Sequence, residues 1–191
     1  MNQPVLSGPT VTLRPLAIAD AGALAAAAAE SRQHYVYTRV PDGIGEAERY
    51  IAAALRDREG GHRMPFVTLW HDRVVGSTSY LDIQQWRWPE GSPLQRTDRP
   101  DALEPRDDRW SLEHFWVDPR WHGRGVGRQM YAHAVDRVRT IRPGVLVIEA
   151  DPYAAAFYAR MGARQTGTVP APVEGDPDRT LPVFEVDVKA A

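Results

Sequence analysis

The sequence contains no cysteine among its 191 residues. Disulfide bonds, thiolate metal sites and a cysteine nucleophile are therefore excluded. An excess of positive charge is also missing, because the formal net charge is -2 at pH 7. A chain without a basic excess has no general attraction to nucleic acid, so we expect no nucleic-acid partner.

Long apolar runs are absent as well. The run "ALAAAAAE" at residues 23–30 is far shorter than the ~20 residues that span a membrane, and alanine favours a helix. The first residues, "MNQPVLSGPTVTLRPL", lack the basic flank and apolar core of a signal peptide. We expect a cytoplasmic protein with no membrane partner, and one domain over residues 1–191.

Hydrophobic periodicity predicts alternating strands and helices. Residues 11–16, "VTLRPL", alternate apolar and polar side chains as a half-buried strand does, and residues 145–150, "VLVIEA", form a continuous apolar run. Such a run is typical of a strand covered on both faces. Further strands are expected up to 70 and at 74–83, 111–117, 164–169 and 181–188, and helices at 20–32, 45–59, 126–139 and within "YAAAFYARMGA".

This order of elements predicts the fold class. The strand, helix and strand over residues 111–150 make a βαβ unit, whose connection is right-handed. The remaining strands are mixed, so we predict an α/β or α+β fold with one largely antiparallel sheet. Residues 89–109 lose the pattern and are rich in proline and charge, which predicts a flexible loop or lid.

A glycine-rich loop lies between the strand and the helix of this unit. In "VDPRWHGRGVGRQM" the glycines are Gly123, Gly125 and Gly127. Glycine lets backbone N–H groups approach a ligand closely, and the N-terminus of the next helix adds unpaired N–H groups and partial positive charge. Arg124 and Arg128 add positive charge, and the whole pattern predicts a site that binds a phosphate group.

Other phosphate motifs fit less well. The P-loop string G-x-x-x-x-G-K-[ST] is absent, and the dinucleotide fingerprint G-x-G-x-x-G differs from the G-x-G-x-G of this chain. Glu149 and Asp151 follow the next strand, where a dinucleotide domain carries its ribose-binding acid. A dinucleotide site therefore stays open, as does a tight turn that needs glycine but binds nothing.

The same stretch resembles motif A of the GNAT superfamily of acetyl-CoA-dependent N-acyltransferases. That motif, [QR]-x-x-G-x-[GA], falls on His122, Gly125 and Gly127, with histidine where members usually carry Gln or Arg. A second stretch, "DPYAAAFYARMGA", is similar to the family's N-x-x-A-x-x-F-Y-x-x-x-G-F, with Asp151 for Asn and Ala163 for the aromatic residue. The N-terminal half resembles the branch that acetylates N-termini of ribosomal proteins, and the C-terminal half resembles a separate group of small bacterial acetyltransferases.

The resemblance implies a GNAT fold, with helices on both faces of the sheet, and acetyl-CoA as co-substrate without a metal. It implies that the backbone of Phe115, Trp116 and Val117 pairs with the pantetheine arm, because the strands at Val117 and Val145 splay apart in this fold. Asp151 occupies the position of the family asparagine that lies beside the cofactor, so the resemblance implies that it lines the acetyl-CoA site. The pyrophosphate is expected at His122, Gly123, Arg124, Gly125, Val126, Gly127 and Arg128.

Two residues are candidates for acid–base chemistry. Glu113, on the strand that enters the loop, is the expected general base, and an ion-paired strand glutamate is the alternative. His114 should point to the opposite face, since side chains alternate along a strand, and would be the base only after a register shift. Tyr158 matches the family tyrosine that reaches the CoA sulfur, so it is the expected general acid, and a core tyrosine is the alternative.

The acceptor site is expected in "HYVYTRVP", residues 34–41. Tyr35 and Tyr37 can face a cationic amine, because aromatic faces attract cations, although helix–loop packing explains them equally well. Trp86, Trp88 and Trp110 are expected to form an aromatic wall or a dimer contact. The acceptor is a small-molecule amine or a protein N-terminus, and the protein a monomer or homodimer. A non-catalytic acyl-CoA-binding module is the alternative function.

Overall fold

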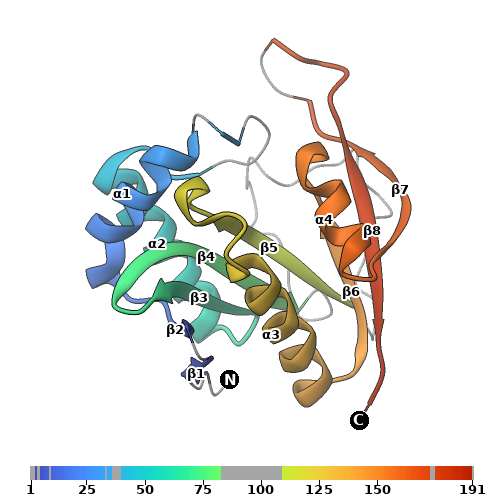
Figure 1. Cartoon of the computed structure of the whole chain (residues 1–191), viewed down its shortest axis with the longest axis horizontal. Coiled ribbons are helices and arrows are strands. Elements are labelled where there is room, and N and C mark those ends of the chain that lie inside the picture. Colours follow the sequence, from blue (N-terminus) through green and yellow to red (C-terminus); the bar gives the residue numbers. More distant parts are fainter. Residues whose placement is uncertain are drawn as a thin grey trace.

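One mixed sheet of eight strands forms the centre of the computed structural model, in the order β1-β2-β3-β4-β5-β6-β8-β7 (Figure 1). The structure describes residues 3, 5–8, 10–32, 34–35, 40–82, 109–172 and 175–190. The strands are β1 (Leu6–Ser7), β2 (Val11–Pro15), β3 (Arg63–Trp70), β4 (Arg73–Asp82), β5 (Arg109–Val117), β6 (Gly144–Glu149), β7 (Arg164–Pro170) and β8 (Thr180–Val188).

Strands β5 and β6 run parallel, and every other neighbouring pair is antiparallel. The predicted α/β class with one largely antiparallel sheet is therefore confirmed. The helices are α1 (Ala21–Arg32), α2 (Gly43–Glu59), α3 (Val126–Ile141) and α4 (Ala155–Arg160), with short 3-10 turns η1 (Ile18–Asp20), η2 (Pro119–Trp121) and η3 (Pro152–Ala154).

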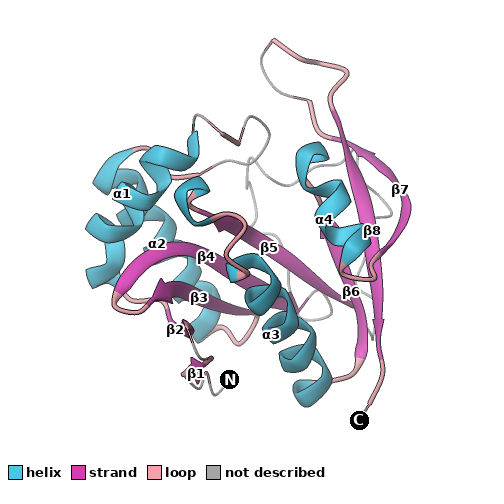
Figure 2. Ribbon diagram, viewed as in Figure 1, coloured by secondary structure: helices cyan, strands magenta, loops and turns pink. Residues whose placement is uncertain are grey.

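The helices cover both faces of the sheet (Figure 2). On one face, the alanine-rich side of α1 and the Ala47–Ile51–Ala54 stripe of α2 pack on Val67 and Trp116. On the other face, α3 and α4 bury Val126, Met130, Ala134 and Tyr158 against the sheet. These two apolar layers hold the central strands in place from both sides.

Strand β5 leaves β6 soon after it begins. The ladder between them joins Arg109, Trp110 and Ser111 to residues 145–147 and then stops. Strand β5 continues to Val117 on its other side, where it still pairs with β4. Figure 1 shows the two strands side by side at the lower right and diverging from there. The backbone of residues 112–117 therefore has an edge that β6 does not cover.

A β-bulge in β5 changes which side chains share a face. The register with β4 shifts between Ser77 and Ser79, and His114 has a left-handed backbone, with φ of 51°. A bulge places two residues opposite one, so the alternation of side chains is broken. Glu113 and His114 consequently both lie on the α2 face, and the expectation that they point to opposite faces is wrong.

Some boundaries differ from expectation. Arg109 begins β5 instead of ending the loop, because it pairs with Val145 and forms an ion pair of 3.1 Å with Glu185. Trp110 is fully buried in the core and donates its indole N–H to the Arg142 carbonyl at 3.1 Å, so it forms neither an exposed wall nor a dimer contact. The predicted lid, apart from Arg109, and Trp86 and Trp88 lie outside the described residues.

Within the described part of the chain, none of the helices is long and apolar enough to cross a membrane.

Gly76 allows the close approach of β4 and β5 at the end of β5, where it lies opposite Val117. A Cβ atom there would lie 2.3 Å from the Trp116 carbonyl oxygen, which is backbone and has little freedom to move. We expect Gly76→Ala to lower the free energy of unfolding by about 1–3 kcal/mol, as overpacking does. Urea unfolding followed by tryptophan fluorescence measures this change.

Gly167→Ala on β7 is the matched control, because a Cβ atom at Gly167 meets nothing within 4 Å. It should change the free energy of unfolding by no more than about 0.5 kcal/mol. Equal unfolding midpoints for the two variants would show that the contact at Gly76 is easily relieved.

Candidate functional site

The glycine-rich loop is an open backbone cradle at the end of β5. Gly123 and Gly125 have left-handed backbones, with φ of 72° and 82°, which a side chain disfavours. A Cβ atom at either position would meet nothing within 4 Å. Glycine is therefore required there by the backbone conformation, and no atom of the described residues fills the space beside either glycine.

The first turn of α3 offers unpaired N–H groups to this space. Gly125 is the N-cap residue of α3, and no side chain caps the helix. The first hydrogen bond of the helix runs from Gln129 N to Gly125 O at 3.1 Å, so the N–H groups of Val126, Gly127 and Arg128 precede the helical ladder. Such an N-terminus favours an anion, and the loop therefore fits a phosphate or pyrophosphate.

The side chains of the loop support the cradle from outside. Val126 is buried in the core, and Gly127 lies under the ring of Phe157, where a Cβ atom would be 3.5 Å from the ring. The guanidinium of Arg124 lies over the ring of Trp121, 5.2 Å from its centroid. Arg128 is exposed on the first turn of α3, and it adds positive charge beside the unpaired N–H groups.

His122 and Tyr35 meet at the last carbonyl of β5. The Tyr35 hydroxyl donates to the Val117 carbonyl oxygen at 2.9 Å, and His122 Nε2 lies 3.0 Å from the same oxygen and 2.8 Å from the hydroxyl. Burial raises the pKa of Tyr35 to about 12 and lowers that of His122 below its usual value. At neutral pH both side chains are therefore uncharged, and Tyr35 is joined to the end of β5 and to the loop.

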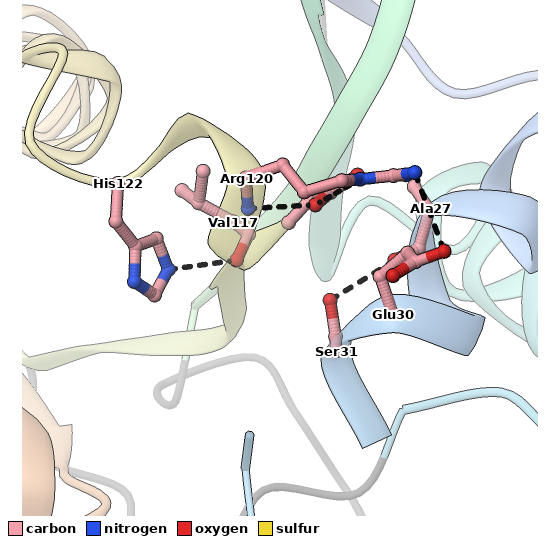
Figure 3. Close-up of polar contacts among 7 residues, drawn as sticks. Ala27, Glu30, Ser31, Val117, Arg120 and His122 are labelled. Carbon is pink, nitrogen blue, oxygen red and sulfur yellow. Dashed lines mark hydrogen bonds and ion pairs between the residues drawn. The ribbon is translucent and has the colours of Figure 1, made fainter. Parts of the chain in front are cut away.

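A charged bridge joins the same loop to α1. Asp118 is fully buried and accepts hydrogen bonds from the Arg120 backbone N–H at 3.0 Å and its guanidinium at 2.6 Å. The Arg120 guanidinium also lies 3.3 Å from Glu30 on α1. Figure 3 shows Arg120 reaching across to Glu30, with His122 turned toward Val117 on the other side of the turn.

Tyr158 and Phe115 line the diverging strands from the α4 side. Their ring centroids are 6.0 Å apart, and the Tyr158 side chain is almost fully buried. Burial, and then the nearby Tyr35 and Asp151, raise the pKa of the Tyr158 phenol above its ordinary value. Tyr158 is therefore protonated at neutral pH. Asp151 is itself buried and caps η3, accepting from the Tyr153 N–H at 2.9 Å.

Glu113 is held in an ion-pair network on the α2 face. Its Oε2 lies 2.8 Å from Arg63, whose Nε lies 3.0 Å from Asp57. The side chain of Arg63 is only 9% exposed and that of Glu113 is 25% exposed, so the pair is shielded from water on the arginine side. The Glu113 carboxylate is therefore engaged by Arg63, as the ion-paired alternative for a strand glutamate describes.

A pocket of about 260 Å³ opens beside this network, between α2 and β5. His114 lines it, with its ring 4.8 Å from that of Tyr50. Burial, and then the charge of Arg63, lower the pKa of His114 to about 4, so the imidazole is neutral at pH 7. The lining residues are Val40, Pro41, Glu46, Arg49, Tyr50, His114 and Trp116.

The structure brings most of the expected site residues together. Direct contacts join Tyr35, His122 and Val117. Tyr158 packs on Phe115. The Trp116 side chain lines the pocket and belongs to the apolar layer beneath α1 and α2. Tyr37 lies outside the described residues. No sequence pattern selects Arg63, Arg49 or Tyr50 as site residues, because the positions of all three depend on how α2 and β3 lie beside β5.

Comparisons with known proteins agree with this geometry. Residues 27–163 match the family model described as the acetyltransferase (GNAT) family. No protein of curated function matches the sequence significantly.

Solved structures share the fold at low sequence identity. An acetyl transferase from Salmonella typhimurium that modifies the N-terminal serine of ribosomal protein L7/L12 has a TM-score of 0.73 and 13% identity, covering 97% of this chain and 99% of its own. RimJ from Mycobacterium smegmatis, in complex with CoA-disulfide, has a TM-score of 0.69 and 17% identity, covering 96% and 84%. The Salmonella typhimurium protein yncA, with its cofactor acetyl-CoA, has a TM-score of 0.65 and 18% identity, covering 94% of each chain.

If the glycine-rich loop holds the phosphates, a substitution within it should prevent the binding of acetyl-CoA. Gly125→Glu should abolish the binding of acetyl-CoA, because a side chain and a negative charge would then face the expected pyrophosphate. Calorimetric titration with acetyl-CoA measures the loss, and circular dichroism shows whether the variant is folded.

Gly61→Glu is the control, since Gly61 also has a left-handed backbone, with φ of 78°, and free space around it. It carries the same backbone strain and the same charge but lies before β3, away from the cradle. A folded Gly125→Glu variant with the affinity of the parent would show that the loop does not hold the phosphates.

Proposed function

We propose that this chain, which belongs to the GNAT family of acetyltransferases by the match over residues 27–163, is an acetyl-CoA-dependent N-acetyltransferase. It transfers the acetyl group directly to a primary amine. The acceptor is a small molecule or a protein N-terminus. The observation that carries the proposal is the joint position of the glycine cradle, the free edge of β5 and the pocket beside His114.

The residues of the chain fit acetyl-CoA, which supplies the activated acetyl group as a thioester. The N–H groups of Val126, Gly127 and Arg128 would hold the pyrophosphate, with Arg124 and Arg128 adding charge. The backbone edge of residues 112–117, which β6 leaves uncovered, would pair with the amides of the pantetheine arm, and at Val117 the ligand would replace the Tyr35 hydroxyl. This edge runs from the cradle toward His114, so it leads from the phosphate site to the acceptor pocket.

An amine must lose a proton during the reaction. A lysine-like amine with a pKa of about 10.4 is neutral in only about one molecule in 2,500 at pH 7. His114 and Glu113 are both on the pocket side of β5, but Glu113 is engaged by Arg63 at 2.8 Å. We therefore assign the proton acceptor to the neutral imidazole of His114, with Glu113 and Arg63 holding the bulge beside it.

Tyr158 is proposed as the proton donor to the departing thiolate. It lies on the opposite side of the free edge from His114, beside Phe115, so donor and acceptor flank the same stretch of backbone. Its raised pKa keeps the phenol protonated throughout the physiological range. A cytoplasmic location is proposed with this function, because acetyl-CoA is a highly charged molecule that is kept inside cells.

Substituting each of the two candidate bases in turn shows which of them accepts the proton. We expect His114→Asn to lower kcat/KM about 10²- to 10⁴-fold at pH 7, and the deficit to shrink as the pH rises and the acceptor deprotonates by itself. Asparagine tolerates the left-handed backbone of His114. We expect Glu113→Gln to lower the melting temperature, because it breaks the ion pair with Arg63, and to change the rate much less.

The measurement is a pH–rate profile for each variant, with free CoA thiol detected during turnover. His71→Asn is the control, since His71 also has a positive φ, of 50°, and is exposed at the β3–β4 turn. A pH-dependent loss of kcat/KM in Glu113→Gln, with none in His114→Asn, would instead identify Glu113 as the general base.

Tyr158→Phe tests the proton donor. Phenylalanine keeps the ring and its packing but removes the hydroxyl, so we expect folding and acetyl-CoA affinity to stay nearly intact. The value of kcat should fall by roughly 10- to 1,000-fold, within the usual range for acid–base groups. Melting temperature and kcat are measured on the same preparation.

A lower melting temperature with an unchanged kcat per folded molecule would instead make Tyr158 a core residue. A protein that binds acetyl-CoA but releases no thiol with any amine would be a non-catalytic acyl-CoA-binding module.

A further inference from the structure

The pocket beside His114 has a distinct chemical character. Most of its lining is apolar or aromatic, from Val40, Pro41, Tyr50 and Trp116, and two charged residues of α2, Glu46 and Arg49, complete it. Its volume of about 260 Å³ is below the ~300–1,000 Å³ of sites for drug-sized ligands. The pocket is therefore suited to one small molecule of about the size of an amino acid.

The two charged residues differ in what they already bind. The Glu46 Oε2 accepts a hydrogen bond from the Asp42 backbone N–H at 2.8 Å, at the start of α2. Arg49 is exposed and makes no hydrogen bond or ion pair with any residue in the described part of the chain. By contrast, Arg32 nearby donates to the Pro41 carbonyl at 2.6 Å and lies 3.2 Å from Asp42.

Among the described residues, the charged groups of β3 and β5 beside the pocket are paired. Glu113 is paired with Arg63, and Arg63 is paired in turn with Asp57. His114 is neutral at pH 7 because burial lowers its pKa to about 4. Arg49 is thus a cation that lines the pocket without a partner among the described residues. A guanidinium binds a carboxylate through two parallel hydrogen bonds, which makes it a selective ligand for that group.

We propose that the acceptor is a small amine that also carries a carboxylate, of the size of a free amino acid, and that Arg49 binds the carboxylate. This inference rests on the proposed acetyltransferase function and names its substrate class. Arg49 holds the carboxylate at the α2 side, the amine lies toward His114, and Val40, Pro41 and Trp116 surround the rest of the molecule. A protein N-terminus lacks this carboxylate, because its carboxyl group is part of the next peptide bond.

Matched acceptors test the assignment. Free L-amino acids and the corresponding amino-acid amides differ at the carboxylate that Arg49 would bind. The amide also has the lower amine pKa, so more of its amine is neutral at pH 7, and this works against the expected preference for the acid. With the parent protein we expect kcat/KM to be about 10- to 100-fold higher for the acid than for its amide, as the loss of a charged hydrogen bond predicts. Arg49→Gln should abolish this preference by raising KM for the acids, and it should leave KM for acetyl-CoA unchanged.

Arg56→Gln is the control, because Arg56 is an exposed arginine two turns further along α2 and does not line the pocket. It should keep the preference of the parent. Equal rates for acids and amides, or a preference that survives Arg49→Gln, would overturn the role of Arg49 while leaving the acetyltransferase intact. Faster acetylation of peptides than of free amino acids would also overturn it. Acetylation of other primary amines, such as polyamines, but of none of these would overturn the amino-acid acceptor alone. Failure with every amine tested, with acetyl-CoA bound, would overturn the proposed function itself.

Discussion

The site depends on the early end of the ladder between β5 and β6. Two parallel strands that stayed paired would use up the backbone groups of residues 112–117, and a ligand would find no edge to bind. The ladder stops after Ser111, while β5 remains anchored to β4 as far as Val117. One side of β5 is therefore fixed by the sheet and the other side is available, in the same short segment that leads into the glycine cradle.

Several interactions hold β5 in this position. Gly76 lets β4 approach closely, and Glu113 pairs with Arg63 on the α2 face, where the bulge also places His114. The loop that follows is tied to α1 through Asp118, Arg120 and Glu30. The acceptor pocket and the phosphate cradle thus share one rigid support, although their side chains come from opposite faces of the sheet. Preorganisation of this kind reduces the ordering that binding requires.

The sequence predicted the order of the elements and the cradle because both are local properties. Apolar periodicity marks each strand and helix, and alternating glycines at the start of a helix mark a phosphate loop whatever surrounds them. The bulge could not be predicted in this way, since "SLEHFWV" contains no glycine or proline to mark it and reads as a regular strand. Arg63 and Arg49 were missed for a related reason. Arg63 is important because it contacts Glu113, 50 residues away in the sequence, and Arg49 because it lacks a partner among the described residues. Neither property leaves a local sequence pattern.

The contact of Tyr35 and His122 with the Val117 carbonyl has a thermodynamic consequence. A ligand that pairs with this carbonyl must first displace the Tyr35 hydroxyl, which already donates to it at 2.9 Å. Binding at that atom exchanges one hydrogen bond for another, so it contributes little net free energy. In the described part of the chain, no side chain caps the helix that begins after Gly125, so the cradle of Gly123 to Arg128 has no such competitor there. Affinity should therefore arise mainly at the phosphate end, whereas a ligand that reaches the Val117 carbonyl must release Tyr35 from its contact with β5.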